Sequence, residues 1–162
     1  MALGFKLSNS IRGGLIYLAG DSIAALISSE LDWIRAAGVL FIGATLYAIE
    51  IPNYFSWIDK KMNGQSGIRT SMIRATLSML FFNPIWIARH ILFIKLFMFQ
   101  FDQIGWGLLW VGTLSFVVNI PISLGANYII QNKIALQNRF IASAIFSGIM
   151  ALYYSLSMNW FS

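Results

Sequence analysis

Among the ionisable side chains inside long apolar runs of this sequence, four are the first candidates for chemistry: Asp21, Glu50, Arg89 and His90. A charged group at the centre of a bilayer costs at least about 2.5–3.5 kcal/mol, so such residues usually face a partner or a water-filled cavity. Carboxylates and cations in that setting are typical of pathways for ions and small solutes. We see no nucleophile–base arrangement or paired-carboxylate motif, and therefore expect a protein that is not an enzyme and has no catalytic residues.

The composition indicates that the apolar runs are membrane spans. The 162-residue chain is 58% hydrophobic and 10% charged, with a mean hydropathy of +0.71. Soluble domains are about 45–50% apolar and about 25% charged. Apolar stretches near the roughly 20 residues that cross a bilayer as a helix recur along the chain. We predict an all-α, polytopic transmembrane bundle, a single membrane domain over 1–162, with spans at about 13–29, 33–57, 72–98, 104–130 and 140–158.

Several classes of site and partner are excluded by residue counts. The chain has no cysteine, which excludes disulfides, thiolate metal sites and cysteine nucleophiles. One histidine and six acidic residues do not make an ordinary histidine-rich metal site, so we expect neither a metal nor a cofactor. The net charge of +5 comes from basic residues that lie between apolar runs. We interpret them as topology signals of a protein embedded in a lipid bilayer, and expect no nucleic-acid partner.

Lysine and arginine are distributed unevenly between the two sides of the predicted spans. If the spans alternate, eight of the eleven fall on one side: Lys6, Arg12, Lys60, Lys61, Arg69, Arg74, Lys133 and Arg139. Cationic flanks prefer the cytoplasmic or matrix-like side. The N-terminus is therefore predicted to face inside and the C-terminus outside.

An internal repeat relates the first four spans. GVLFIGATLYAIEIP (38–52) aligns without a gap to GLLWVGTLSFVVNIP (107–121), and Glu50 then faces Asn119. IRGGLIYLAGDSI (11–23) aligns to IRATLSMLFFNPI (73–85), and Asp21 faces Asn83. We predict a duplicated two-helix hairpin, with repeat 1 over about 11–60 and repeat 2 over about 73–133, followed by a fifth helix over about 140–158. Parallel repeats of this kind occur in transporters, with the substrate near mid-membrane.

Asp21 and Glu50 are predicted to share a depth. From the predicted span ends, Asp21 lies roughly 12 Å and Glu50 roughly 10 Å from the inner side. They could line one inner vestibule, or each could have a structural partner of its own. Arg89 lies about 25 Å from the inner end of its span, and a salt bridge to these acids would require bending at Pro84.

The third span carries four of the candidates for a solute pathway. Pro84 removes a backbone hydrogen bond, and Asn83 can bond a freed carbonyl or line a cavity. Arg89 either extends to the outer headgroups or forms a cationic mouth that attracts anionic solutes. A lone histidine such as His90 is more often a packed or interfacial residue than a proton relay.

The fifth span has small residues at four-residue spacing. Small residues in this pattern let helix backbones approach closely, either within one chain or between two copies. We expect this helix to mediate packing, homo-oligomerisation or contact with a membrane complex, through Ser143, Ser147, Gly148 and Ala151.

The chain resembles the channel family of peroxisomal and mitochondrial inner membranes that includes peroxisomal membrane protein 2. The resemblance rests on Gly20-Asp21, DWIRAAGVLFIG (32–43), NYFSWID (53–59), FFNP (81–84), IPISLGANY (120–128), IALQNR (134–139) and YYSLS (153–157). A second resemblance, to the bacterial L-alanine exporter family, rests on FNPIWIA (82–88) and GANY (125–128). These resemblances add Asn127 to the candidates, and they imply an organellar (mitochondrial inner or peroxisomal) or bacterial inner membrane.

Together these features predict a channel or transporter for small solutes, anionic ones included. The pathway candidates are Asp21, Glu50, Asn83, Pro84, Arg89, His90, Asn119 and Asn127. Two alternatives stay open: a non-catalytic structural subunit of a larger membrane complex, and an exporter of a small molecule such as an amino acid.

Overall fold

The computed structural model describes residues 6–161, apart from the side chains of residue 151 and residues 154–161. Over this range the chain is all-α, which confirms the predicted fold class. The helices are α1 (Leu7–Ile27), α2 (Trp33–Ile42), α3 (Ala48–Lys61), α4 (Ile68–Phe81), α5 (Pro84–Phe97), α6 (Gly107–Lys133) and α7 (Leu136–Phe161), with a π-helical segment η1 (Gly43–Tyr47) and a short 3-10 helix η2 (Phe101–Gln103).

The helices make up segments of membrane-spanning length. Four are long and apolar enough to cross a bilayer: Leu7–Ile27, Trp33–Lys61, Ile68–Phe97 and Gly107–Lys133. α7 has 26 residues, more than the roughly 20 that a span requires. The protein is therefore a multi-pass membrane protein. Its first helix begins earlier than predicted, at Leu7, and its second span ends later, at Lys61.

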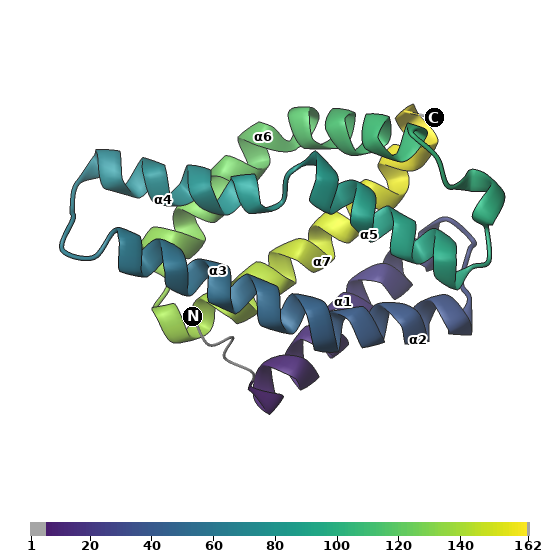
Figure 1. Cartoon of the computed structure of the whole chain (residues 1–162), viewed down its shortest axis with the longest axis horizontal. Coiled ribbons are helices and arrows are strands. Elements are labelled where there is room, and N and C mark those ends of the chain that lie inside the picture. The colour runs from purple at the N-terminus through teal and green to yellow at the C-terminus, as the bar shows by residue number, and fades with distance from the viewer. Residues whose placement is uncertain (1–5, 162) are drawn as a thin grey trace.

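Consecutive segments pack as two hairpins, with α7 crossing them (Figure 1). α1 packs along α2 and η1, and α6 packs along α4 and α5. α7 runs obliquely through the bundle and contacts α1, α6 and α3. The two hairpins correspond to the two predicted repeats, whose common origin stays a prediction. We call the end of the bundle that holds the α3–α4 loop the basic end, because Lys60, Lys61, Arg69, Arg74, Lys133 and Arg139 lie there.

The third span is two helices rather than one. α4 ends at Phe81, and α5 begins at Pro84, where the missing N–H of proline costs nothing because the first turn of a helix has no partner for it. The Asn83 side chain caps α5 by accepting from the Trp86 backbone N–H at 3.0 Å. Its amide nitrogen donates to the Leu80 carbonyl at 3.3 Å. Asn83 thus bonds backbone groups on both sides of the break.

The second span is continuous but contains η1, which the sequence did not predict. A π-helical turn is wider than an α-helical turn and is frequent at functional sites. α1 approaches it closely, because a Cβ added at Gly13 would lie 2.7 Å from the Gly43 carbonyl oxygen. The segment ends with Tyr47, which is fully buried in the bundle.

The small residues of α7 pack inside the protein. A Cβ added at Gly20 of α1 would lie 2.6 Å from the Cα of Gly148, so these two helices touch backbone to backbone. Ser143 and Ser147 are also buried. The predicted packing face is therefore covered by the chain itself from Ser143 to Gly148, and the Ala151 side chain lies outside the described residues.

Candidate functional site

The main polar feature is a stripe on the buried face of α6. The stripe repeats every fourth residue and consists of Ser115, Asn119, Ser123, Asn127 and Gln131, each at most 8% exposed. The opposite face is apolar and more than half exposed at Val117, Val118, Ile122 and Ile129. Residues four apart share one helix face. α6 therefore turns a polar face inward along much of its length and an apolar face outward.

Many polar atoms on and beside the stripe have no protein partner. Asn119 Nδ2 donates to Ser123 Oγ at 2.7 Å and lies 2.8 Å from Met150 Sδ, and Asn127 Nδ2 donates to the Ser123 carbonyl at 2.8 Å. Among the described residues on and beside the stripe, five buried atoms make no hydrogen bond: Asn119 Oδ1, Asn127 Oδ1, Gln131 Nε2, Ser143 Oγ and Ser147 Oγ. Each unsatisfied buried group costs about 1–3 kcal/mol. Helix packing alone does not account for such a face.

A small central cavity lies beside the stripe. Its wall comes from four helices and the residue after α4: Tyr17, Phe82, Trp86, His90, Ser123, Phe146, Ser147 and Met150. Its volume is about 10 Å³, which is room for about one water molecule. The core is thus closed to larger molecules in this conformation.

His90 reaches this cavity from α5 and is held on two sides. Its Nδ1 lies 3.0 Å from the hydroxyl of Tyr47 in η1. The Trp86 ring stacks on the imidazole, with centroids 5.8 Å apart and planes at 10°. The imidazole is 2% exposed. His90 therefore lies in the packed interior and not at an interface.

A buried ion pair closes the bundle at the end opposite the basic end. Arg35, two residues into α2, donates from Nε and Nη2 to the two carboxylate oxygens of Asp21, at 2.9 and 2.7 Å. Both side chains are at most 3% exposed. Arg35 Nη1 also reaches the half-exposed carboxylate of Glu30, at 3.2 Å. Such a bidentate pair is geometrically specific, and breaking it leaves an uncompensated buried charge.

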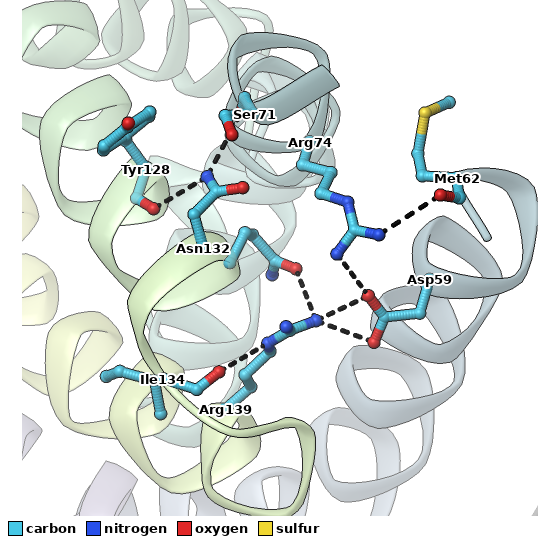
Figure 2. Close-up of polar contacts among 9 residues, drawn as sticks. Asp59, Met62, Ser71, Arg74, Tyr128, Asn132, Ile134 and Arg139 are labelled. Atoms are coloured by element: carbon cyan, nitrogen blue, oxygen red, sulfur yellow. Dashed lines mark hydrogen bonds and ion pairs between the residues drawn. The ribbon is translucent and has the colours of Figure 1, made fainter. Parts of the chain in front are cut away.

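A second cluster closes the basic end and joins four helices (Figure 2). Arg139 of α7 donates to both carboxylate oxygens of Asp59 in α3, at 2.6 and 2.7 Å, and Arg74 of α4 donates to the same carboxylate at 3.0 Å. Arg139 also lies 3.5 Å from the side-chain oxygen of Gln131, the last residue of the α6 stripe. Asn132 adds a bond from α6 to the Ser71 carbonyl of α4, at 3.2 Å.

Glu50 and Arg89 lie apart from this core. Arg89 donates to both carboxylate oxygens of Glu50, at 2.9 and 2.6 Å, and each side chain is 32% exposed. The pair borders a groove of about 450 Å³ that also involves Tyr54, Leu80, Phe81, Asn83, Ile85 and Trp86. The break before Pro84 supplies the bend that this salt bridge was expected to require.

The expectation that Asp21 and Glu50 line one vestibule is wrong. Glu50 lies about 22 Å along a continuous helix from Arg35, the partner of Asp21, so the two acids do not share a depth. The spans begin and end elsewhere than predicted, and each acid has its own arginine. This is the alternative stated from the sequence, in which each acid has a structural partner.

The other predicted candidates fall into two groups. Asn119, Asn127 and His90 lie in the closed core. Asn83 and Pro84 form the helix break and are half-buried.

Sequence reasoning missed several residues of this site: Ser115, Ser123, Gln131, Arg35, Tyr47, Asp59, Arg74 and Arg139. The four-residue spacing from Ser115 to Gln131 is visible in the sequence and would have identified the stripe. Nothing in the sequence marks Tyr47, because its direction depends on η1.

Fold and site together define a multi-pass, all-α membrane protein with a polar, closed core. Within the described residues, no group of three or more histidine, aspartate or glutamate side chains could hold a metal ion. Comparisons with protein families, with curated proteins and with solved structures gave no match.

Proposed function

We propose that this protein is a channel or transporter that moves small polar solutes through the core between α1, α5, α6 and α7. The observation that supports this most is the α6 stripe, five buried polar residues on one helix face. Polar residues inside a membrane are costly and usually mark a pathway or a packing contact. The choice between a pathway and a packing contact depends on whether the polar atoms of these side chains have hydrogen-bond partners in the protein.

The unpaired atoms favour a pathway. Side chains that join membrane helices do so by bonding across the interface. Here, among the described residues, the free oxygens of Asn119 and Asn127 and the hydroxyls of Ser143 and Ser147 face the interior without a partner. A solute or water passing along the stripe would supply those bonds.

The two end clusters act as closures in this proposal. Asp21–Arg35 blocks one end of the core, and Asp59 with Arg74 and Arg139 blocks the basic end. Passage then requires one cluster to open at a time or both to loosen together. At the basic end one carboxylate meets two guanidinium groups, and the surplus positive charge would concentrate small anions there.

Flux into liposomes tests the proposal. The purified chain is reconstituted, and swelling is followed by light scattering with glycerol, acetate and glycine betaine as uncharged, anionic and zwitterionic probes. We expect flux of at least one probe, and we expect Asn127→Leu to reduce it to the level of empty liposomes. The control is Ile129→Leu, which changes an outward-facing, 55% exposed residue on the same helix.

Stability separates a pathway from a packing contact. Replacing an incompletely bonded buried amide by an apolar group of similar size is often neutral or stabilising. Asn127→Leu should therefore keep or raise thermal stability while it removes flux. A destabilised variant with normal flux per folded molecule, or no flux of any probe through the unsubstituted protein, would contradict the proposal.

One observation favours the second candidate, a structural subunit of a membrane complex. The Glu50–Arg89 pair is one-third exposed on a groove near the middle of its spans, where a polar partner helix could cover it. The size of the purified particle, together with any co-purifying subunits, tests this. A stable complex that loses its partner in Arg89→Met, combined with no flux by the isolated chain, would support the structural role.

A further inference from the structure

His90 is the residue of the cavity wall that can become positively charged by binding a proton. Imidazole ordinarily titrates between pH 5 and 8, whereas Tyr17, the other titratable side chain among the described residues of the wall, is a phenol. The wall residues from α6 and α7 are uncharged, and one of them, Ser123, belongs to the stripe. A proton that enters the cavity thus meets one suitable base.

The hydrogen-bond partner of His90 lies in an irregular segment of backbone. Tyr47, which holds Nδ1, is the last residue of η1. One residue turns an α-helix by about 100°, so the additional residue of the π turn sets the direction of Tyr47. π turns are frequent at functional sites. The hydrogen bond of His90 therefore depends on a local deviation from α-helix.

The charges near His90 are balanced while it is neutral. They are Asp21 of α1, Arg35 of α2 and Arg89 of its own helix. Asp21 is neutralised by Arg35, and Arg89 by Glu50. Tyr17 and Tyr47 contribute phenol groups, and α6 and α7 contribute hydroxyls. Protonation of His90 would add one uncompensated positive charge to a closed interior.

The Asp21–Arg35 pair offers a way to compensate that charge. Arg35 already reaches a second carboxylate, Glu30, at 3.2 Å. If Asp21 turns towards a protonated His90, Arg35 keeps Glu30 as its counter-ion. The cluster that closes this end of the core would then loosen.

We propose that His90 is a proton-binding site and that its protonation opens the core at the Asp21–Arg35 end, so that solute movement is coupled to protons. The proton comes from water in the cavity and returns to water when His90 becomes neutral again. This inference rests on the proposed transport function and names the ion that drives or regulates it.

The first experiment measures the protonation state of the imidazole directly. His90 is the only histidine in the chain, so ¹⁵N-histidine labelling gives a single imidazole to follow by NMR in nanodiscs. Between about pH 8 and pH 5, the range in which histidine responds, we expect a reversible change from neutral imidazole to imidazolium. An imidazole that stays neutral throughout would overturn the proposal, and no substitution is involved.

The second experiment measures whether the core opens to water. Because the chain has no cysteine, Ser123→Cys places a single thiol on the cavity wall. Its labelling by a water-soluble methanethiosulfonate is normalised to Asn63→Cys in the exposed α3–α4 loop, which removes the pH dependence of the reagent. We expect the labelling rate to rise about tenfold from pH 8 to pH 5. A rise of this size results when an open state that is a minor species at pH 8 becomes the major one at pH 5. The rise should disappear in Ser123→Cys/His90→Gln.

The outcomes separate the two proposals. Equal labelling at both pH values, or an acid-induced rise that survives His90→Gln, overturns proton coupling but leaves a water-accessible pathway. If a thiol at position 123 stays unlabelled at both pH values, both proton coupling and the pathway are overturned. If the His90→Gln variant does not fold, the NMR titration of the unsubstituted protein decides.

Discussion

Two arginine–carboxylate pairs in this protein are both bidentate but have opposite surroundings. Asp21–Arg35 is at most 3% exposed and lies where α1, α2 and α5 meet, with Arg35 Nη1 3.8 Å from Met98 Sδ. Glu50–Arg89 is 32% exposed on both sides and borders a lateral groove. Both pairs connect helices, but only the first is enclosed by protein.

The difference shows how the bundle distributes polarity. Enclosed polar groups form the stripe, the cavity and the two end clusters, and together they make a closed core. The exposed pair lies outside this core, where it meets whatever surrounds the helices. The enclosed pair should therefore control stability and closure, and the exposed pair should control contacts with neighbours.

The largest expected effect is that of Arg35→Met. It leaves the Asp21 carboxylate buried without its partner, a change that typically costs about 3–5 kcal/mol. Arg89→Met should cost clearly less, because Glu50 is partly exposed. Thermal unfolding in detergent compares the two variants. In the double variant Asp21→Leu/Arg35→Met, most of the stability should return, since no charge is left buried. Equal losses for Arg35→Met and Arg89→Met would remove the distinction between the pairs.

A smaller loss is expected for Gly20→Ala. Its Cβ would lie 2.6 Å from the Gly148 backbone, so α1 and α7 would have to separate. Overpacking of this kind typically costs about 1–3 kcal/mol. Gly125→Ala on α6 is the matched control, because no atom lies within 4 Å of its added Cβ. It should be neutral or stabilising by up to about 1 kcal/mol. Similar melting temperatures for the two variants would argue against close contact between α1 and α7.

The smallest effect is expected on the groove side, for Asn83→Ala. This change removes the side-chain cap of α5 and should cost about 1 kcal/mol. Asn138→Ala, an exposed residue in the first turn of α7, serves as the control and should change little. A loss as large as that of Arg35→Met would mean that the break before Pro84 belongs to the closed core.

The length of the apolar runs was sufficient to predict the all-α fold and the segments of the bundle. The break at Asn83–Pro84 was also foreseeable, since proline and a capping residue stand next to each other. Depth was not. Asp21 and Glu50 were placed by counting residues from span ends, and errors of a few residues at each end moved both acids.

The pairing of charges could not be predicted from the sequence. Arg35 pairs across 14 residues and Arg139 across 80, and no local pattern distinguishes these partners from other carboxylates. Tyr47 faces His90 only because η1 adds a residue to a turn. The stripe was available from four-residue spacing but was overlooked, because single serines and asparagines in apolar runs resemble ordinary helix residues.

Cysteine scanning of α6 tests most directly whether the stripe is a pathway. Single cysteines replace stripe residues 115, 119, 123, 127 and 131 and the outward-facing residues 117, 118, 122 and 129, in a chain that otherwise contains none. A water-soluble thiol reagent is applied to the protein in nanodiscs at about pH 5 and pH 8. A pathway along the stripe predicts labelling every fourth residue, at one or both pH values, with little labelling at the outward-facing positions. Protection of all five stripe positions at both pH values, as in a permanently dry helix interface, would contradict it.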